Sequence, residues 1–179
     1  MRYLIGKEKE RSIIYFNHAI EESKKATCLR SKCGAVIVKG KKIIGRGFNS
    51  PPGNLESQRR CSIKKNEYPE KTTDKTCCVH AEQRAVIDAL KNNLAKIIGS
   101  RLYFVRLNKN DEFMFAGNPY CTICSKFVLD SGIKEFALWH KEGIRVYNST
   151  EYNDISFGKS KIFFPKTLNN PFTQKYYKF

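Results

Sequence analysis

Residues 80–107 read HAEQRAVIDALKNNLAKIIGSRLYFVRL, and they carry the strongest structural signal in the chain. The first part places Ala85, Val86 and Ala89 at the three- and four-residue spacing of one helix face. The last part, residues 101–107, is a short apolar run that is typical of a buried strand. A helix that leads into a buried strand is a building unit of α/β domains.

The sequence before this stretch continues the alternation. Residues 8–27 carry apolar and charged side chains in a helical rhythm, which predicts a surface helix. The segment GAVIVKGKKIIGRGF, residues 34–48, has two β-branched runs around Lys39-Gly40-Lys41 and predicts an antiparallel hairpin. Residues 49–76 have no sustained period and predict a long loop, and such loops in compact domains are often functional.

The sequence after it predicts one more helix and two more strands. Residues 121–132 favour a helix that ends at Gly132, and the strands are expected at 134–139 and 144–147. A parallel crossover needs a dozen or more residues, and the link from 140 to 143 is far shorter, so these last two strands should run antiparallel. The expected fold is α/β, a three-layer α/β/α sandwich around a mixed five-stranded sheet.

Size and composition fit one soluble globular domain. The chain has 179 residues, of which 41% are hydrophobic and 28% are charged. We expect a catalytic domain over residues 1–156 and an aromatic, basic extension over residues 157–179. The absence of an apolar run of about 18 residues and of a signal peptide predicts a cytoplasmic protein without a membrane partner.

The net charge and the cysteines leave alternatives open. The formal charge of +16 attracts phosphates on a small nucleotide or on a polynucleotide, or it reflects scattered surface lysines. The seven cysteines are an odd number and favour metal binding over a disulfide framework. Five of them are either buried thiols or a set from which four could bind a second, structural zinc ion: Cys28, Cys33, Cys61, Cys77 and Cys78.

The remaining two cysteines predict a catalytic metal site. Cys121 and Cys124 lie three residues apart at the start of a predicted helix, so both sulfurs share one face, and His80 opens another helix. Three protein ligands leave the fourth position of a Zn²⁺ ion free for water, whose pKa the metal lowers to about 7. Glu82, two residues after His80, is placed to accept and deliver protons without binding the ion.

The motifs His80-x-Glu82 and Cys121-x-x-Cys124 resemble the signature of the zinc-dependent cytidine deaminase superfamily. The resemblance covers about residues 10–140 and implies a cytidine deaminase-like fold, with Glu82 as general acid and base. The segment SKCGAVIVKGKKIIGRGFNSPPG, residues 31–53, resembles the deoxycytidylate deaminase branch. The family has proline directly before the first cysteine, whereas here Tyr120 intervenes.

This resemblance also implies substrate contacts. Asn49 would hydrogen-bond the sugar or base, and the alternative is that it only closes a turn. Ala81 and Tyr120, each next to a metal ligand, are expected to contact the substrate. Arg84 stands where the nucleotide enzymes usually have asparagine, and it could bind a phosphate or point into solvent.

The leading function is therefore conversion of dCMP to dUMP or a related deamination of a free nucleotide or nucleoside. Superfamily relatives commonly oligomerise, so a homo-oligomer is expected by analogy. Base deamination in RNA or single-stranded DNA is the main alternative and would require a continuous basic groove. A zinc-stabilised binding module without chemistry and a riboflavin-pathway deaminase are less favoured.

Overall fold

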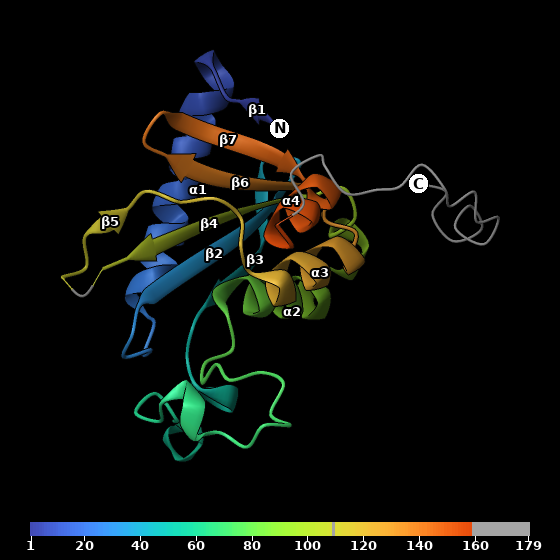
Figure 1. The fold of residues 1–179 in the computed structure, drawn as a ribbon. Coiled ribbons are helices and arrows are strands. Elements are labelled where there is room, and N and C mark those ends of the chain that lie inside the picture. Colours follow the sequence, from blue (N-terminus) through green and yellow to red (C-terminus); the bar gives the residue numbers. More distant parts are fainter. Residues whose placement is uncertain (109, 159–179) are drawn as a thin grey trace, which may run out of the picture.

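The computed structural model describes residues 1–108 and 110–158 (Figure 1). The helices are α1 (Gly6–Lys24), α2 (Ala81–Asn93), α3 (Thr122–Asp130) and α4 (Ser149–Ser156). The strands are β1 (Arg2–Tyr3), β2 (Lys32–Lys39), β3 (Lys42–Phe48), β4 (Arg101–Leu107), β5 (Phe113–Met114), β6 (Glu135–His140) and β7 (Gly143–Asn148). No helix in the described part of the chain is long and apolar enough to cross a membrane.

The strands form one mixed sheet in the order β1-β7-β6-β4-β2-β3, with β5 paired to β4. Only β4 and β6 run parallel, and β6 and β7 are antiparallel, as their short connection predicts. The sheet has seven strands instead of the expected five, because two strands of two residues each are added: β1 beside β7 and β5 beside the end of β4. A strand of two residues is too short to show the alternation of apolar and polar side chains by which a strand is predicted from sequence.

Helices cover both faces of the sheet, which confirms the three-layer architecture. α1 packs on β2 and β4, whereas α2 packs on β3 and β2 from the other side and contacts α3, which contacts α4 (Figure 1). Successive side chains of a strand point to opposite faces. Accordingly Ala35 and Ile37 belong to the core under α2 and α3, and Val36 and Val38 belong to the core under α1.

The α2 helix lies unusually close to the sheet. A Cβ atom at Gly47 of β3 would stand 2.2 Å from the carbonyl oxygen of Ala81, the first residue of α2. Only glycine permits this approach of two backbones. The N-terminus of α2 is thereby held against the end of β3, and the metal ligand predicted at position 80 precedes it directly.

The segment between β3 and α2 is the long loop expected from sequence. It contains three short 3₁₀ turns, η1 (Pro52–Asn54), η2 (Glu56–Gln58) and η3 (Lys65–Glu67), and it extends away from one end of the sheet (Figure 1). Its two ends are joined, because the backbone N–H of Val79 donates to the carbonyl of Ser50 at 3.0 Å. The loop therefore leaves and re-enters the domain at one place.

α4 was not expected from sequence. Its N-cap is Asn148, whose side chain accepts a hydrogen bond from the backbone N–H of Thr150 at 3.0 Å. Residues 159–179, most of the predicted C-terminal extension, lie outside the described residues, so a domain boundary at residue 156 remains a prediction.

Candidate active site

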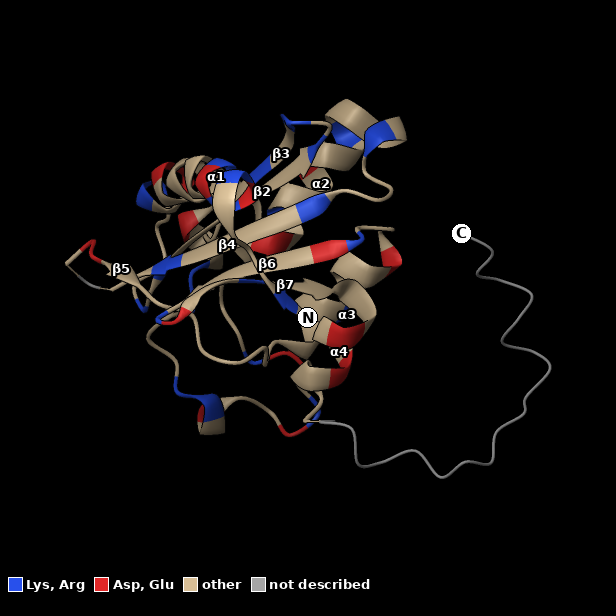
Figure 2. Cartoon of the chain, turned by 90° about the horizontal axis from the view of Figure 1, so that it is seen from above, with Lys and Arg blue, Asp and Glu red and all other residues tan. Residues whose placement is uncertain are grey.

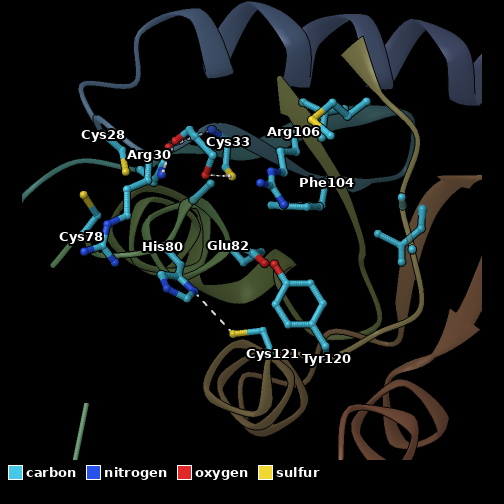
Figure 3. Close-up of a pocket in the computed structure, with 18 of the residues that line it drawn as sticks. Cys28, Arg30, Cys33, Cys78, His80, Glu82, Phe104, Arg106, Tyr120 and Cys121 are labelled. Atoms are coloured by element: carbon cyan, nitrogen blue, oxygen red, sulfur yellow. Dashed lines mark hydrogen bonds between the residues drawn. The ribbon is translucent and has the colours of Figure 1, made fainter. Parts of the chain in front are cut away.

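The three predicted metal ligands meet where two helices begin. His80 is the N-cap residue of α2, Cys121 is the N-cap residue of α3, and Cys124 lies in the first turn of α3. His80 Nδ1 lies 3.4 Å from the sulfur of Cys121 (Figure 3) and 3.1 Å from the sulfur of Cys124. All three ligand atoms lie within 4.8 Å of one another.

This arrangement fits a tetrahedral zinc ion. Zn–N and Zn–S bonds of about 2.0 and 2.3 Å at tetrahedral angles place nitrogen and sulfur roughly 3.5 Å apart. Two thiols and one imidazole are also the soft and borderline donors that zinc prefers. The residues present therefore fit the metal that the sequence predicts.

The local structure favours the thiolate of Cys121, which is the form that binds zinc, and pairs it with a protonated His80, which would lose that proton on binding the metal. Two hydrogen bonds lower the pKa of the Cys121 thiol to about 4, and the bond with Cys124 has a larger effect than the bond with His80. Burial opposes this decrease. The hydrogen bond with Cys121 raises the pKa of His80 to about 9. The backbone N–H of Cys124 also points to the Cys121 sulfur at 3.5 Å, where the helix dipole adds to the effect.

Glu82 is the second residue of α2 and is 5% exposed. Burial raises the pKa of its carboxyl group, while the charge of His80 opposes the increase. The carboxylate lines the same cavity as His80 and Cys121, and Figure 3 shows it between His80 and Tyr120. A carboxylate so placed has access both to the metal centre and to a molecule in the cavity.

The cavity has a volume of about 260 Å³. Such a volume lies just below the range of roughly 300–1,000 Å³ that is usual for small-molecule sites. Its wall combines the metal centre with aromatic and cationic side chains from the α1–β2 connection, the long loop, β4, β6 and α4: Arg30, Lys65, Phe104, Arg106, Trp139 and Tyr152. The enclosure is thus built from segments that are far apart in the chain.

Asn49 and Ala81 both line this cavity. The Asn49 side chain also joins the end of β3 to the start of β2, since its Oδ1 accepts from the backbone N–H of Cys33 at 2.8 Å and its Nδ2 donates to the carbonyl of Ser31 at 2.9 Å. The amide oxygen keeps a second lone pair for a ligand. A substrate contact by Asn49 or Ala81 remains a prediction.

Tyr120 and Arg84 occupy different surroundings. Tyr120 is 74% exposed and stands at the cavity beside Glu82 (Figure 3). Arg84 is not among the described residues that line the cavity. Its guanidinium donates to the carbonyl of Pro51 at 2.9 Å and lies 6.0 Å from the ring centre of Phe48, so it holds the long loop to α2.

Two cavity residues that sequence reasoning missed are Arg106 and Tyr152. Arg106 is the exposed charged residue that interrupts the apolar run of β4, and this interruption was the available signal. Tyr152 comes from α4, where it stacks on Phe136 with ring centres 3.9 Å apart. The signal for α4 was Asn148 followed by Glu151 at the spacing of a capping box.

A mixed α/β sandwich with a His/Cys/Cys cluster and a buried glutamate beside it defines a class of metal-dependent hydrolytic deaminases. Residues 9–139 match the family described as the cytidine and deoxycytidylate deaminase zinc-binding region. The chain belongs to this family, which confirms the resemblance seen in its motifs.

Curated relatives agree with this assignment. A deoxycytidylate deaminase from Mycobacterium phage D29 is 31% identical over 122 residues, which are 65% of this chain and 84% of the relative. A deoxycytidylate deaminase from Schizosaccharomyces pombe is 24% identical over 118 residues, which are 63% of this chain. The chain matches only 32% of the length of this second relative.

Solved structures support the fold. The dCMP deaminase of cyanophage S-TIM5, crystallised with dCMP and dUMP, superposes with a TM-score of 0.51 at 24% identity over 74% of this chain and 82% of its own. A cytidine deaminase from Burkholderia pseudomallei also gives 0.51, at 17% identity over 78% of this chain and 94% of its own. Both likenesses confirm a cytidine deaminase-like fold.

Proposed function

We propose that this chain is a zinc-dependent hydrolase that removes the exocyclic amine of a cytosine-type nucleotide, with dCMP as its preferred substrate. The observation that carries the proposal is the convergence of His80 Nδ1 with the sulfurs of Cys121 and Cys124 at a cavity that Glu82 also lines. Membership in the deaminase family supports the same reaction. A purely structural metal site would have no use for the buried carboxylate.

His80, Cys121 and Cys124 would hold the zinc ion. When bound, the ion supplies a Lewis acid that lowers the pKa of water to about 7. Glu82 takes a proton from the attacking water and delivers protons to the ring nitrogen and to the departing amine. Oxygen from water bonds to C4, the bond from C4 to the amine breaks, and ammonia leaves a uracil-type product.

Arg106 supports a substrate that carries a phosphate. Its guanidinium points into the same space as Glu82 and Tyr120 (Figure 3). It forms no salt bridge within residues 1–108 and 110–158. Arginine binds phosphate oxygens in a bidentate manner, so Arg106 is the group we assign to the 5′-phosphate.

A free nucleotide fits the site better than a polynucleotide. The cavity of about 260 Å³ has room for no more than one small molecule. Figure 2 shows Lys and Arg distributed over α1, strand ends and the long loop, with acidic residues between them. Deamination within RNA or single-stranded DNA would call for a continuous basic groove along the strand. Homo-oligomer formation is a separate prediction that sedimentation would test.

A substrate comparison tests the proposed function. The zinc-loaded protein is incubated with dCMP, CMP, deoxycytidine, cytidine and a cytosine-containing single-stranded oligonucleotide, and release of ammonia is measured. We expect kcat/KM for dCMP to exceed that for deoxycytidine by at least about tenfold, which corresponds to roughly 1.4 kcal/mol. Faster conversion of the oligonucleotide than of dCMP would show that a polynucleotide is the substrate. If none of the five substrates releases ammonia, the proposed enzymatic function is wrong.

A further inference from the structure

The long loop between β3 and α2 has no apolar core of its own. Within residues 52–79 it forms no α-helix and no extended strand, and only two side chains in this range are buried. Both of these side chains are cysteines, Cys61 at 8% and Cys78 at 9% exposed. Small units that cannot bury enough apolar surface are usually held by disulfides or by a metal ion.

The buried thiols converge with a third one. The sulfur atoms of Cys28, Cys61 and Cys78 all lie within 4.8 Å of one another. Cys28 follows α1, Cys61 lies in the middle of the loop, and Cys78 precedes α2, so three remote segments meet here. Figure 3 shows the sulfurs of Cys28 and Cys78 pointing toward each other. Thiolates on a tetrahedral zinc ion lie about 3.8 Å apart, which this spacing accommodates.

Cys77, the neighbour of Cys78, offers a further thiol beside this cluster, although its sulfur is not one of the three that lie within 4.8 Å of one another. It accepts a hydrogen bond of 2.9 Å from the backbone N–H of Arg60, the residue before Cys61. Hydrogen bonds from backbone N–H groups to sulfur accompany thiolate ligation in metal sites.

Arginines surround the cluster. The Arg59 guanidinium lies 3.6 Å from the Cys61 sulfur and donates to the carbonyl of Thr27 at 2.8 Å. Arg30 donates to the carbonyl of Cys61 at 3.0 Å and to that of Ile63 at 3.1 Å. Four thiolates around a divalent cation leave a net negative charge, and neighbouring guanidinium groups stabilise such a charge.

We propose that Cys28, Cys61, Cys77 and Cys78 bind a second zinc ion. Four protein ligands leave no open position, so this site is structural and takes no part in the reaction. The ion joins the loop to the end of α1 and to the segment that leads into His80. Since the loop also contributes Lys65 to the cavity wall, the metal keeps one side of the active site in place.

Zinc content of the full-length protein tests this proposal. We expect about two zinc ions per chain in the unaltered protein, about one after Cys61→Ser or Cys121→Ser, and about none after both. Cys33→Ser is the matched control with about two, because Cys33 belongs to neither cluster. About one zinc per chain, lost in Cys121→Ser and kept in Cys61→Ser, would refute the second site while leaving the proposed reaction untouched.

A second measurement covers the case in which Cys61→Ser does not fold. X-ray absorption at the zinc edge of the unaltered protein should give on average roughly three sulfur ligands per zinc, since four sulfurs bind one ion and two bind the other. A value of about two would overturn the proposal. A disulfide between Cys61 and Cys78 in the protein purified without reductant would also overturn it.

Discussion

Ser125 Oγ donates a hydrogen bond of 2.8 Å to Asn153 Oδ1, and this bond joins the turn of α3 that carries the predicted ligand Cys124 to α4. Ser125 follows Cys124 directly and is 1% exposed. The helix that was not expected from sequence therefore supports the position of a predicted metal ligand. Tyr152, the neighbour of Asn153, also lines the active-site cavity.

Asn153→Ala should lower the melting temperature by about 2–4 °C, which corresponds to roughly 1 kcal/mol for a chain of this size. The loss is moderate because the Ser125 hydroxyl can turn to the carbonyl of Thr122, 3.2 Å away. Asn153→Asp keeps an acceptor and should restore most of the stability. Asn17→Ala on the exposed face of α1 is the control. An unchanged melting temperature in Asn153→Ala would show that the bond contributes nothing.

Glu82→Gln should reduce kcat by about 10²–10⁴-fold, because the amide cannot accept the proton that the carboxylate takes from water. Zinc content should stay unchanged, since Glu82 is not among the three ligands. Glu21→Gln, an exposed carboxylate on α1, should leave kcat at the level of the unaltered protein. Steady-state rates and elemental analysis of both variants check this, and parallel loss of metal and activity would make Glu82 a ligand.

Arg106→Gln should reduce kcat/KM for dCMP by about 10–100-fold through a higher KM, because it removes the charge assigned to the 5′-phosphate. The same variant should leave the rate with deoxycytidine unchanged. Arg46→Gln, an exposed arginine that pairs with Glu22 away from the cavity, is the matched control. Equal losses with both substrates would place Arg106 in a structural role.

Sequence reasoning was most accurate where a pattern is local. The apolar run of residues 101–107 coincides with β4, and the hairpin predicted around Gly40 is formed by β2 and β3. In that turn Gly40 and Lys41 have φ angles of 54° and 67°, which suit a two-residue hairpin. Local signals also placed His80, Cys121 and Cys124 at helix N-termini.

The cavity wall was much harder to predict. Arg106 reaches the site from β4, and Tyr152 reaches it from α4, so their positions depend on how the sheet and helices pack. No short sequence pattern encodes that packing. Arg84 shows the opposite error, since a residue predicted to contact the substrate lies away from the cavity. Its guanidinium donates to the carbonyl of Pro51 instead.

The buried side chain of His140 should make the free energy of unfolding depend on pH. It is 5% exposed at the end of β6, with Nε2 3.0 Å from the hydroxyl of Tyr147. Burial, and then the charge of Arg145, lower its pKa below the usual 6.5, while the backbone of Ala116 and the charge of Glu142 oppose this. The unfolded chain therefore binds a proton at a higher pH than the folded protein does.

The resulting stabilisation is complete above pH 6.5 and decreases as the pH falls toward the lowered pKa of folded His140. Chemical unfolding of the unaltered protein should thus show a lower free energy of unfolding at about pH 5.5 than at about pH 7.5. His140→Gln should make this decrease smaller, because an amide does not titrate in this range. His18→Gln, at an exposed position of α1, should keep the full decrease. Identical pH profiles for His140→Gln and the unaltered protein would assign the effect to other groups.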